Sequence, residues 1–105
     1  MNTHQKYNTV NHHHFGFMYE RPDGTSNWPG SELMLVECVD GRWFIEQEAG
    51  DEYNQFPGVV KSGQDLDTEP TFYPDVDSCA RAAFALIKQV YPGTSDDNLA
   101  RFLDS

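Results

Sequence analysis

The clearest pattern along the chain is a pair of β-prone runs in its middle. Residues 32–39 are rich in Leu and Val, residues 42–49 begin with Trp, Phe and Ile after Arg42, and only Asp40 and Gly41 separate the two runs. An Asp-Gly pair between two such runs is typical of a two-residue hairpin turn. The pattern therefore predicts an antiparallel hairpin in which Val39 lies opposite Arg42.

This register divides the hairpin into two faces, because successive side chains of a strand point to opposite sides. The face expected to form the core carries Met34, Val36, Cys38, Trp43 and Ile45. The other face mixes large apolar groups with carboxylates, namely Leu33, Leu35, Phe44, Glu37, Glu46 and Glu48. Such a mixture fits a binding patch, but three large apolar groups side by side are unusual on a free surface. The favoured interpretation is that the N-terminal strand or the C-terminal helix covers this face, with the glutamates at its rim.

Weaker patterns predict further strands. Residues 14–19 alternate between aromatic and other side chains, and the Arg-Pro-Asp-Gly sequence at residues 21–24 indicates a turn. A loop is expected from there to Ser31, and residues 56–60 are expected to form a short edge strand. Residues 1–11 are polar and without periodicity, which predicts a mobile arm or a short edge segment.

Two helices are predicted near the C-terminus. The first opens at Asp75 or Asp77, either of which can cap it, and ends near Tyr91 because a Pro-Gly pair follows. Its apolar stripe is broad enough to pack on the core face of the hairpin. A second, short helix is predicted from Ser95. We therefore expect a single α+β domain over residues 1–105, with a small antiparallel sheet of three to four strands packed by one main helix and a short C-terminal helix.

Length and net charge limit the classes of function that the chain can have. The 105 residues suit one domain, and 17 Asp and Glu against 7 Lys and Arg give a formal net charge of −10. This charge disfavours direct binding to nucleic acid or to anionic membranes, and it favours basic protein surfaces. The N-terminal residues contain no apolar run of the kind found in signal peptides or membrane spans, so we expect a cytoplasmic protein.

Three consecutive histidines, His12, His13 and His14, are the most obvious candidates for metal binding. On a strand, His12 and His14 would share a face while His13 pointed away. Two ligands do not close a site, and further ligands would have to come from Cys38, His4 or a distant carboxylate, without a supporting spacing. We therefore expect a polar strand here, with no metal and no cofactor.

The two cysteines are expected to be reduced, since neither belongs to a CxxC pair. Cys38 lies on the predicted core face, whereas Cys79 lies in the first turn of the main helix, where the helix dipole lowers the pKa of a thiol. The chain has no phosphate-binding glycine loop, no nucleophile elbow and no metalloprotease motif. We expect no catalytic residues and no enzymatic activity.

Negative charge is concentrated in the predicted hairpin. Between Glu32 and Phe56 the chain has seven acidic residues and only Arg42 to balance them. Carboxylates beside apolar anchors are typical of a surface that binds a partner. The residues expected to contact that partner are Leu35, Glu37, Phe44, Glu46, Glu48, Asp51, Glu52, Asp65, Asp67 and Glu69.

In its size, its charge and its carboxylates spread from Glu37 to Glu69, the chain resembles small acidic phage proteins that inhibit host nucleic-acid machinery, such as anti-CRISPR and antirestriction proteins. The resemblance implies an inhibitor that docks on a basic surface of a nucleic-acid-binding protein complex in the host cytoplasm. Its carboxylates would stand in for phosphates. It would act as a monomer or a homodimer.

Two other hypotheses stay open. The chain could be a non-catalytic adaptor or a dimeric regulatory protein that uses the face of Leu33, Leu35 and Phe44. It could also be a metal- or thiol-dependent enzyme built on the histidines or the cysteines.

Overall fold

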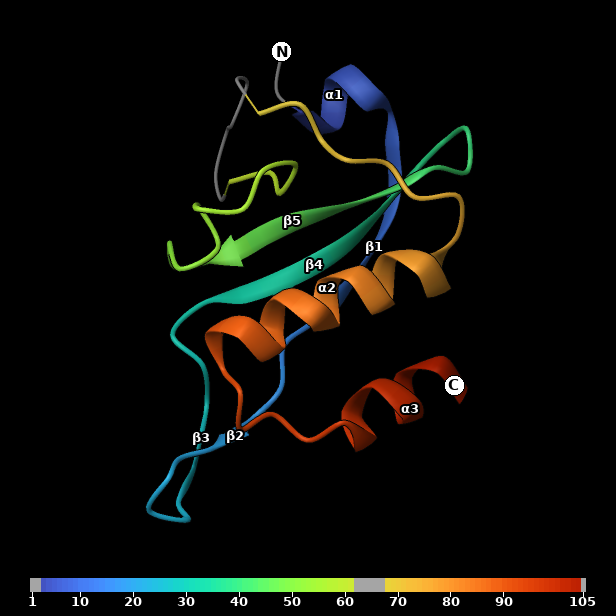
Figure 1. Cartoon of the computed structure of the whole chain (residues 1–105). Helices are drawn as coiled ribbons and strands as arrows, with labels where there is room; N and C mark the ends of the chain where they lie inside the picture. Colours follow the sequence, from blue (N-terminus) through green and yellow to red (C-terminus); the bar gives the residue numbers. More distant parts are fainter. Residues whose placement is uncertain (1–2, 62–67, 105) are drawn as a thin grey trace.

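A three-stranded antiparallel sheet forms the centre of the structure, a computed structural model that describes residues 3–61 and 68–104 (Figure 1). Its strands are β1 (Thr9–Phe15), β4 (Glu32–Cys38) and β5 (Trp43–Ala49), and β4 lies between the other two. The short strands β2 (Tyr19–Glu20) and β3 (Ser26–Asn27) form a separate two-stranded ribbon. Together with the helices, these strands confirm the predicted α+β class.

The main helix, α2 (Val76–Val90), covers one face of the sheet (Figure 1). Of the two predicted candidates, Asp75 is the cap, because its carboxylate accepts a hydrogen bond from the backbone N–H of Ser78 at 2.7 Å. The helix ends at Tyr91, whose N–H donates to the carbonyl oxygen of Ile87. Both predicted ends of this helix are thus confirmed.

The short C-terminal helix is α3 (Asp97–Asp104), which lies beside α2 (Figure 1). The hydroxyl of Ser95 accepts a hydrogen bond from the Asp97 N–H at 3.2 Å, so Ser95 helps to start the helix. The half-buried apolar side chains of α3 pack against the main core; they are Leu99, Phe102 and Leu103. This helix is also confirmed.

The turn between β4 and β5 differs from the prediction. The Cys38 N–H donates to the carbonyl oxygen of Arg42 at 2.8 Å, and the Gly41 N–H donates to that of Cys38 at 2.9 Å. The loop therefore holds the three residues 39–41, with Gly41 at φ 89°, a left-handed conformation that suits glycine. Since the loop is one residue longer than predicted, the predicted register is wrong by one residue.

This shift changes which side chains share a face. Leu35 lies opposite Ile45 and packs toward α2, whereas Val36 lies opposite Phe44 on the other side. The predicted grouping of Leu33 and Leu35 with Phe44 is therefore wrong. We call the α2 side of the sheet the helix face, formed by Phe15, Leu33, Leu35, Trp43 and Ile45. We call the opposite side the outer face, formed by His12, His14, Met34, Val36, Cys38, Phe44, Glu46 and Glu48.

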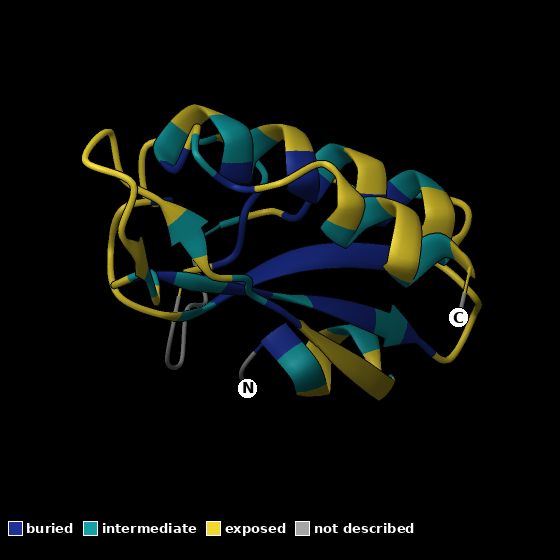
Figure 2. Ribbon diagram, turned by 90° about the horizontal axis from the view of Figure 1, so that it is seen from below, coloured by how far each residue is buried: buried dark blue, intermediate teal, exposed yellow. Residues whose placement is uncertain are grey.

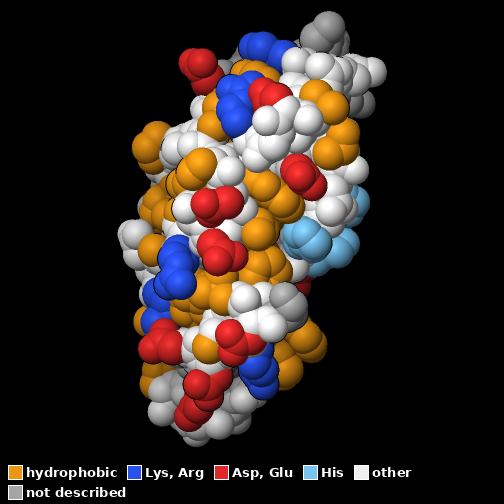
Figure 3. Space-filling view, turned by 90° about the vertical axis from the view of Figure 1, so that its right-hand side faces the viewer, with side chains coloured by type: hydrophobic (Ala, Val, Ile, Leu, Met, Phe, Trp, Pro, Cys, Tyr) orange, Lys and Arg blue, Asp and Glu red, His pale blue; other side chains and the backbone are white. Residues whose placement is uncertain are grey.

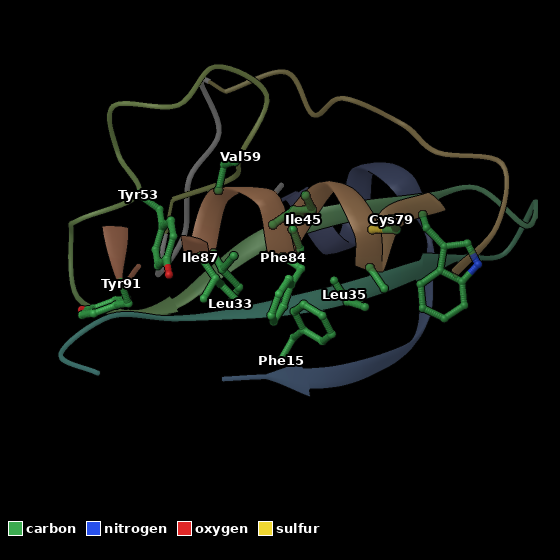
Figure 4. Close-up of a cluster of buried hydrophobic side chains, with 13 residues drawn as sticks. Phe15, Leu33, Leu35, Ile45, Tyr53, Val59, Cys79, Phe84, Ile87 and Tyr91 are labelled. Carbon is green, nitrogen blue, oxygen red and sulfur yellow. The ribbon is translucent and has the colours of Figure 1, made fainter. Parts of the chain in front are cut away.

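The helix face and α2 enclose the main hydrophobic core (Figure 4). Leu33, Leu35 and Ile45 reach the core from the sheet, and Phe84 and Ile87 reach it from α2 (Figure 4). Burying such a side chain stabilises the fold by about 1.5–3 kcal/mol. The prediction had placed α2 on the face of Met34, Val36 and Cys38, and the structure places it on the face of Leu33 and Leu35.

The outer face is covered by α1 (Thr3–Tyr7) and by the segment around Phe72, which lie across the sheet from α2 (Figure 1). The rings of Tyr7 and Phe72 lie 6.3 and 6.1 Å from the ring of Phe44, measured between centroids. Asn8, at φ 52°, turns the chain from α1 into β1. Residues 3–7 thus form a packed helix in place of the predicted arm.

The first strand also begins earlier than predicted. β1 starts at Thr9 and ends at Phe15, whereas the alternation had indicated residues 14–19. The turn at residues 21–24 is confirmed, because the Gly24 N–H donates to the carbonyl oxygen of Arg21 at 2.9 Å. That turn joins β2 to β3, inside the region expected to be a loop.

The two edges of the sheet differ. Along β5, the Gln47 N–H donates to the carbonyl oxygen of Val60 at 2.7 Å, and Trp43 exchanges two backbone hydrogen bonds with Tyr73. Residues 56–60 therefore reach this edge through one bridge at Val60 and not as the predicted strand. Along β1, most of which is exposed (Figure 2), no segment within residues 3–61 or 68–104 pairs except β4.

Candidate interaction surfaces

Three of the residues predicted to contact a partner lie inside the protein. Leu35 and Phe44 are fully buried on opposite faces of the sheet, and Glu46 is 6% exposed. α2 covers Leu35, while α1 and Phe72 cover Phe44. These side chains are inaccessible to a partner, and the adaptor hypothesis loses the apolar face on which it depended.

Glu46 is buried with a partner. One of its carboxylate oxygens lies 2.6 Å from Nε2 of His4, and Nδ1 of the same imidazole lies 2.8 Å from the Thr9 hydroxyl. A buried carboxylate needs such a neighbour because leaving water costs it several kcal/mol, on the order of the penalty for any buried ion. The pair ties α1 to β5, so Glu46 holds the fold together.

Four acidic residues lie at the end of the hairpin where β4 begins and β5 ends. Glu32 lies opposite Ala49, and Asp51 and Glu52 follow in the turn after β5. The Glu52 N–H donates to the Ser31 hydroxyl at 3.1 Å, which brings this turn against the start of β4. We call Glu32, Glu48, Asp51 and Glu52 the acidic end of the hairpin. Sequence reasoning missed Glu32, although hairpin pairing alone puts the first residue of one strand beside the last residue of the other.

The acidic end is anchored to the core. The Tyr91 hydroxyl donates to the carboxylate of Glu52 and accepts a hydrogen bond from the Ser31 N–H at 3.0 Å. Burial raises the pKa of Tyr91, and the hydrogen bond to Glu52 raises it further. Gly50, at φ 79°, lets the turn approach this point, since a Cβ there would lie 2.0 Å from the Ser31 hydroxyl. The carboxylate of Glu52 is therefore held on a fixed support.

The remaining predicted contact residues lie elsewhere. Glu37 is half-buried near the far end of β4, beside Trp43. Glu69 is exposed on the segment that leads to Phe72. Asp65 and Asp67 lie outside the described residues. Of the predicted set, Glu48, Asp51 and Glu52 thus lie at one end of the hairpin and Glu37 near the other, while the carboxylate of Glu48 bonds His14 and that of Glu52 bonds Tyr91.

Exposed carboxylates outnumber their basic partners. In the described part of the chain they are Glu20, Asp23, Asp40, Asp51, Glu52, Glu69, Asp75, Asp77, Asp96, Asp97 and Asp104. Within that part, Arg42 pairs with Asp40 at 2.8 Å and Lys88 with Asp96 at 3.3 Å, while the others form no ion pair with Lys or Arg. On the face seen in Figure 3, acidic side chains are scattered among hydrophobic ones. Most of the negative charge therefore faces solvent.

The histidines of β1 divide between the two faces, as the sequence predicts for a strand. His13 stacks on the Trp43 ring with centroids 5.7 Å apart, on the side of α3. His12 and His14 lie on the outer face with ring centroids 5.4 Å apart. The pale blue side chains visible in Figure 3 gather at one margin of the molecule.

Both cysteines are buried and reduced. Burial raises the pKa of Cys79 to about 12, and the nearby Asp75 carboxylate adds to that effect. Burial also raises the pKa of Cys38. The pKa of Cys79 is therefore raised and not lowered as predicted, because burial disfavours the charged thiolate.

No group of three or more His, Cys, Asp or Glu side chains within residues 3–61 and 68–104 is arranged to hold a metal ion. None of the helices in this described part is both long and apolar enough to cross a bilayer.

Comparison of the chain with protein-family models, with curated proteins and with solved structures gives no significant match. Any functional conclusion therefore depends on the residues themselves.

Proposed function

We propose that the chain is a non-catalytic acidic protein that docks on a basic surface of a nucleic-acid-handling protein and blocks it. The observation that carries this proposal is the exposed negative charge. The formal net charge is −10, and most exposed carboxylates in the described residues lack a Lys or Arg partner. Such a field accelerates encounter with a basic surface and repels nucleic acid itself.

The acidic end of the hairpin is the part of the surface best suited to this role. No Lys or Arg occurs between Arg42 and Lys61 in the chain, so the carboxylates of Asp51 and Glu52 are not neutralised by sequence neighbours. Glu52 is fixed by Tyr91 and by Ser31, which limits the entropy lost on binding. Carboxylates held in place on a rigid support can occupy positions that nucleic-acid phosphates take on the partner.

The test is capture of partners at two salt concentrations. Immobilised protein is incubated with nuclease-treated lysate from the native host, and washes at about 0.05 and 0.5 M salt are compared, because the screening length shortens about threefold over that range. We expect basic nucleic-acid-binding proteins to be retained at low salt and released at high salt. A captured protein should then lose a labelled oligonucleotide, measured by fluorescence anisotropy, as the acidic chain is added.

Two double variants separate a local surface from overall charge. Glu32→Lys with Asp51→Lys alters the acidic end, while Glu20→Lys with Asp104→Lys makes the same change in net charge at two exposed positions elsewhere. We expect the first pair to weaken capture severalfold more than the second. Retention that does not depend on salt, or equal effects of the two pairs, would contradict the proposal.

A further inference from the structure

His12 and His14 form a pair of imidazoles suited to binding one metal ion. They are two residues apart on β1, so both side chains lie on the outer face, and both are exposed. Their ring centroids are 5.4 Å apart. Rotation of an exposed side chain is inexpensive, so the ring of His12 can turn toward an ion held by His14.

His14 also has the neighbour that a metal-binding imidazole commonly has. Its Nδ1 lies 2.8 Å from Oε2 of Glu48. A carboxylate on one ring nitrogen orients the imidazole, makes the other nitrogen a better ligand and leaves it free for the metal. In this structure the free nitrogen of His14 is Nε2.

The other two histidines are engaged elsewhere. His4 uses Nε2 toward Glu46 and Nδ1 toward the Thr9 hydroxyl. His13 lies on the opposite side of β1, stacked on Trp43. Hence only His12 and His14 are available on the outer face, and two ligands are half of the four that a structural zinc site needs.

The backbone of β1 can supply the other half by pairing with a second copy. The His12 N–H donates to the side-chain oxygen of Asn11 at 2.9 Å, so it points away from β4. Because backbone groups alternate along a strand, His14 presents its N–H and C=O on the same open edge. A bulge at residues 9–11 leaves the register with β4 regular from Asn11 to Phe15.

Charge also favours this edge for contact between two copies. Residues 3–19 contain no Asp or Glu, although the whole chain has a formal net charge of −10. Two identical acidic molecules repel each other least when they meet through a strand that carries no carboxylate, and β1 is such a strand. An exposed strand edge without lysine or proline is also open to pairing, and β1 has neither residue.

We propose that His12 and His14 are one half of a zinc site, completed by the same two residues of a second copy that pairs antiparallel along the β1 edge. With the two-fold axis at His13, each His12 lies opposite the other copy's His14. Four imidazoles then meet on the outer side of a continuous six-stranded sheet, a ligand set that suits zinc. This inference does not depend on the proposed function.

The experiment is sedimentation velocity of the full chain in EDTA and with half an equivalent of Zn²⁺, with the zinc stoichiometry measured by titration calorimetry. We expect a monomer in EDTA, and with zinc a dimer that binds one ion per two chains. His12→Ala with His14→Ala should remain monomeric in both conditions. The control His13→Ala, on the same strand but the other face, should dimerise with zinc.

Glu48→Gln tests the carboxylate behind His14. It should lower the zinc affinity by about 10- to 100-fold and still give the dimer when zinc is in excess. Circular dichroism verifies that each variant is folded. A dimer in EDTA, one zinc bound per monomer, no response to zinc, or a zinc response that follows His13 would each overturn the proposal.

Discussion

The two faces of the central sheet use the same three strands in different ways. The side chains that form the helix face are all apolar, and the apolar stripe of α2 packs against them. The outer face is apolar only around Val36 and Phe44, and its margins carry carboxylates paired with histidines. The two faces differ because different segments cover them: α2 covers the helix face, whereas α1 and the segment around Phe72 cover the outer face.

A helix of 15 residues can seal a face with hydrophobic contacts alone, whereas α1 has only five residues and is largely polar. The outer face is therefore completed by the His4–Glu46 pair and by rings such as Tyr7. Hydrophobic burial is the main source of stability at the helix face. At the outer face, pairs of histidine and carboxylate side chains add polar interactions to a smaller apolar cluster. The proposed zinc ligands, His12 and His14, accordingly lie on the outer face.

The largest expected effect is on the helix face. Leu35→Ala removes a fully buried side chain and should lower the free energy of unfolding by about 2–5 kcal/mol. Urea denaturation followed by circular dichroism measures this. Val10→Ala, at a position that is 60% exposed, is the control and should change stability by less than about 0.5 kcal/mol. Equal losses for the two variants would mean that the helix face is not the main core.

A smaller effect is expected on the outer face. Glu46→Ala leaves His4 without its partner at the α1–β5 contact and should cost about 1–3 kcal/mol in unfolding free energy. Glu48→Ala, two residues further along the same strand, breaks the more exposed pair with His14 and should cost less than about 1 kcal/mol. The same denaturation experiment compares them. If Glu48→Ala were the more damaging, the burial of Glu46 would not determine its importance.

The last prediction concerns alkaline pH. Because burial raises the pKa of Cys79 from 9.0 to about 12, the unfolded chain loses this proton before the folded one does. The resulting stability is complete below pH 9 and should be lost as the pH rises toward 12, by at most about 1.4 kcal/mol per pH unit. Urea midpoints between pH 8 and pH 11 measure it.

Cys79→Ala should flatten this pH dependence, and Cys38→Ala should do so less, since the shift at Cys38 is smaller. Tyr53 adds a dependence of the same sign above its own ordinary pKa, because burial raises that pKa as well. An unchanged slope in Cys79→Ala would show that the thiol is not desolvated in the folded state.

Local signals predicted most of the secondary structure. Asp75 and Asp77 were the two predicted candidates for the cap of α2, because a helix start needs a side-chain acceptor for its free N–H groups, and the structure shows that Asp75 is the cap. The two strands of the β4–β5 hairpin and the start of α3 followed in the same way from short-range patterns. Such features depend on neighbouring residues, which the sequence displays directly.

The candidate site was predicted less well. Asp40-Gly41 allows both a two-residue turn and a three-residue turn, and the choice moved Phe44 away from the face of Leu35. Glu48, Asp51 and Glu52 were nevertheless identified, because the acidic end follows from chain proximity. Glu46 was misjudged, since its burial depends on α1, whose polar residues gave no periodic signal.

By itself the sequence determined the fold class, the main helix with its cap, the existence of the hairpin and the large negative charge. Only the tertiary structure decided the register, the cover over each face and the open edge at β1. The physical reason is the separation along the chain of the residues that interact. Caps, turns and charge are properties of short segments, whereas burial depends on contacts between residues far apart in the chain, such as His4 with Glu46.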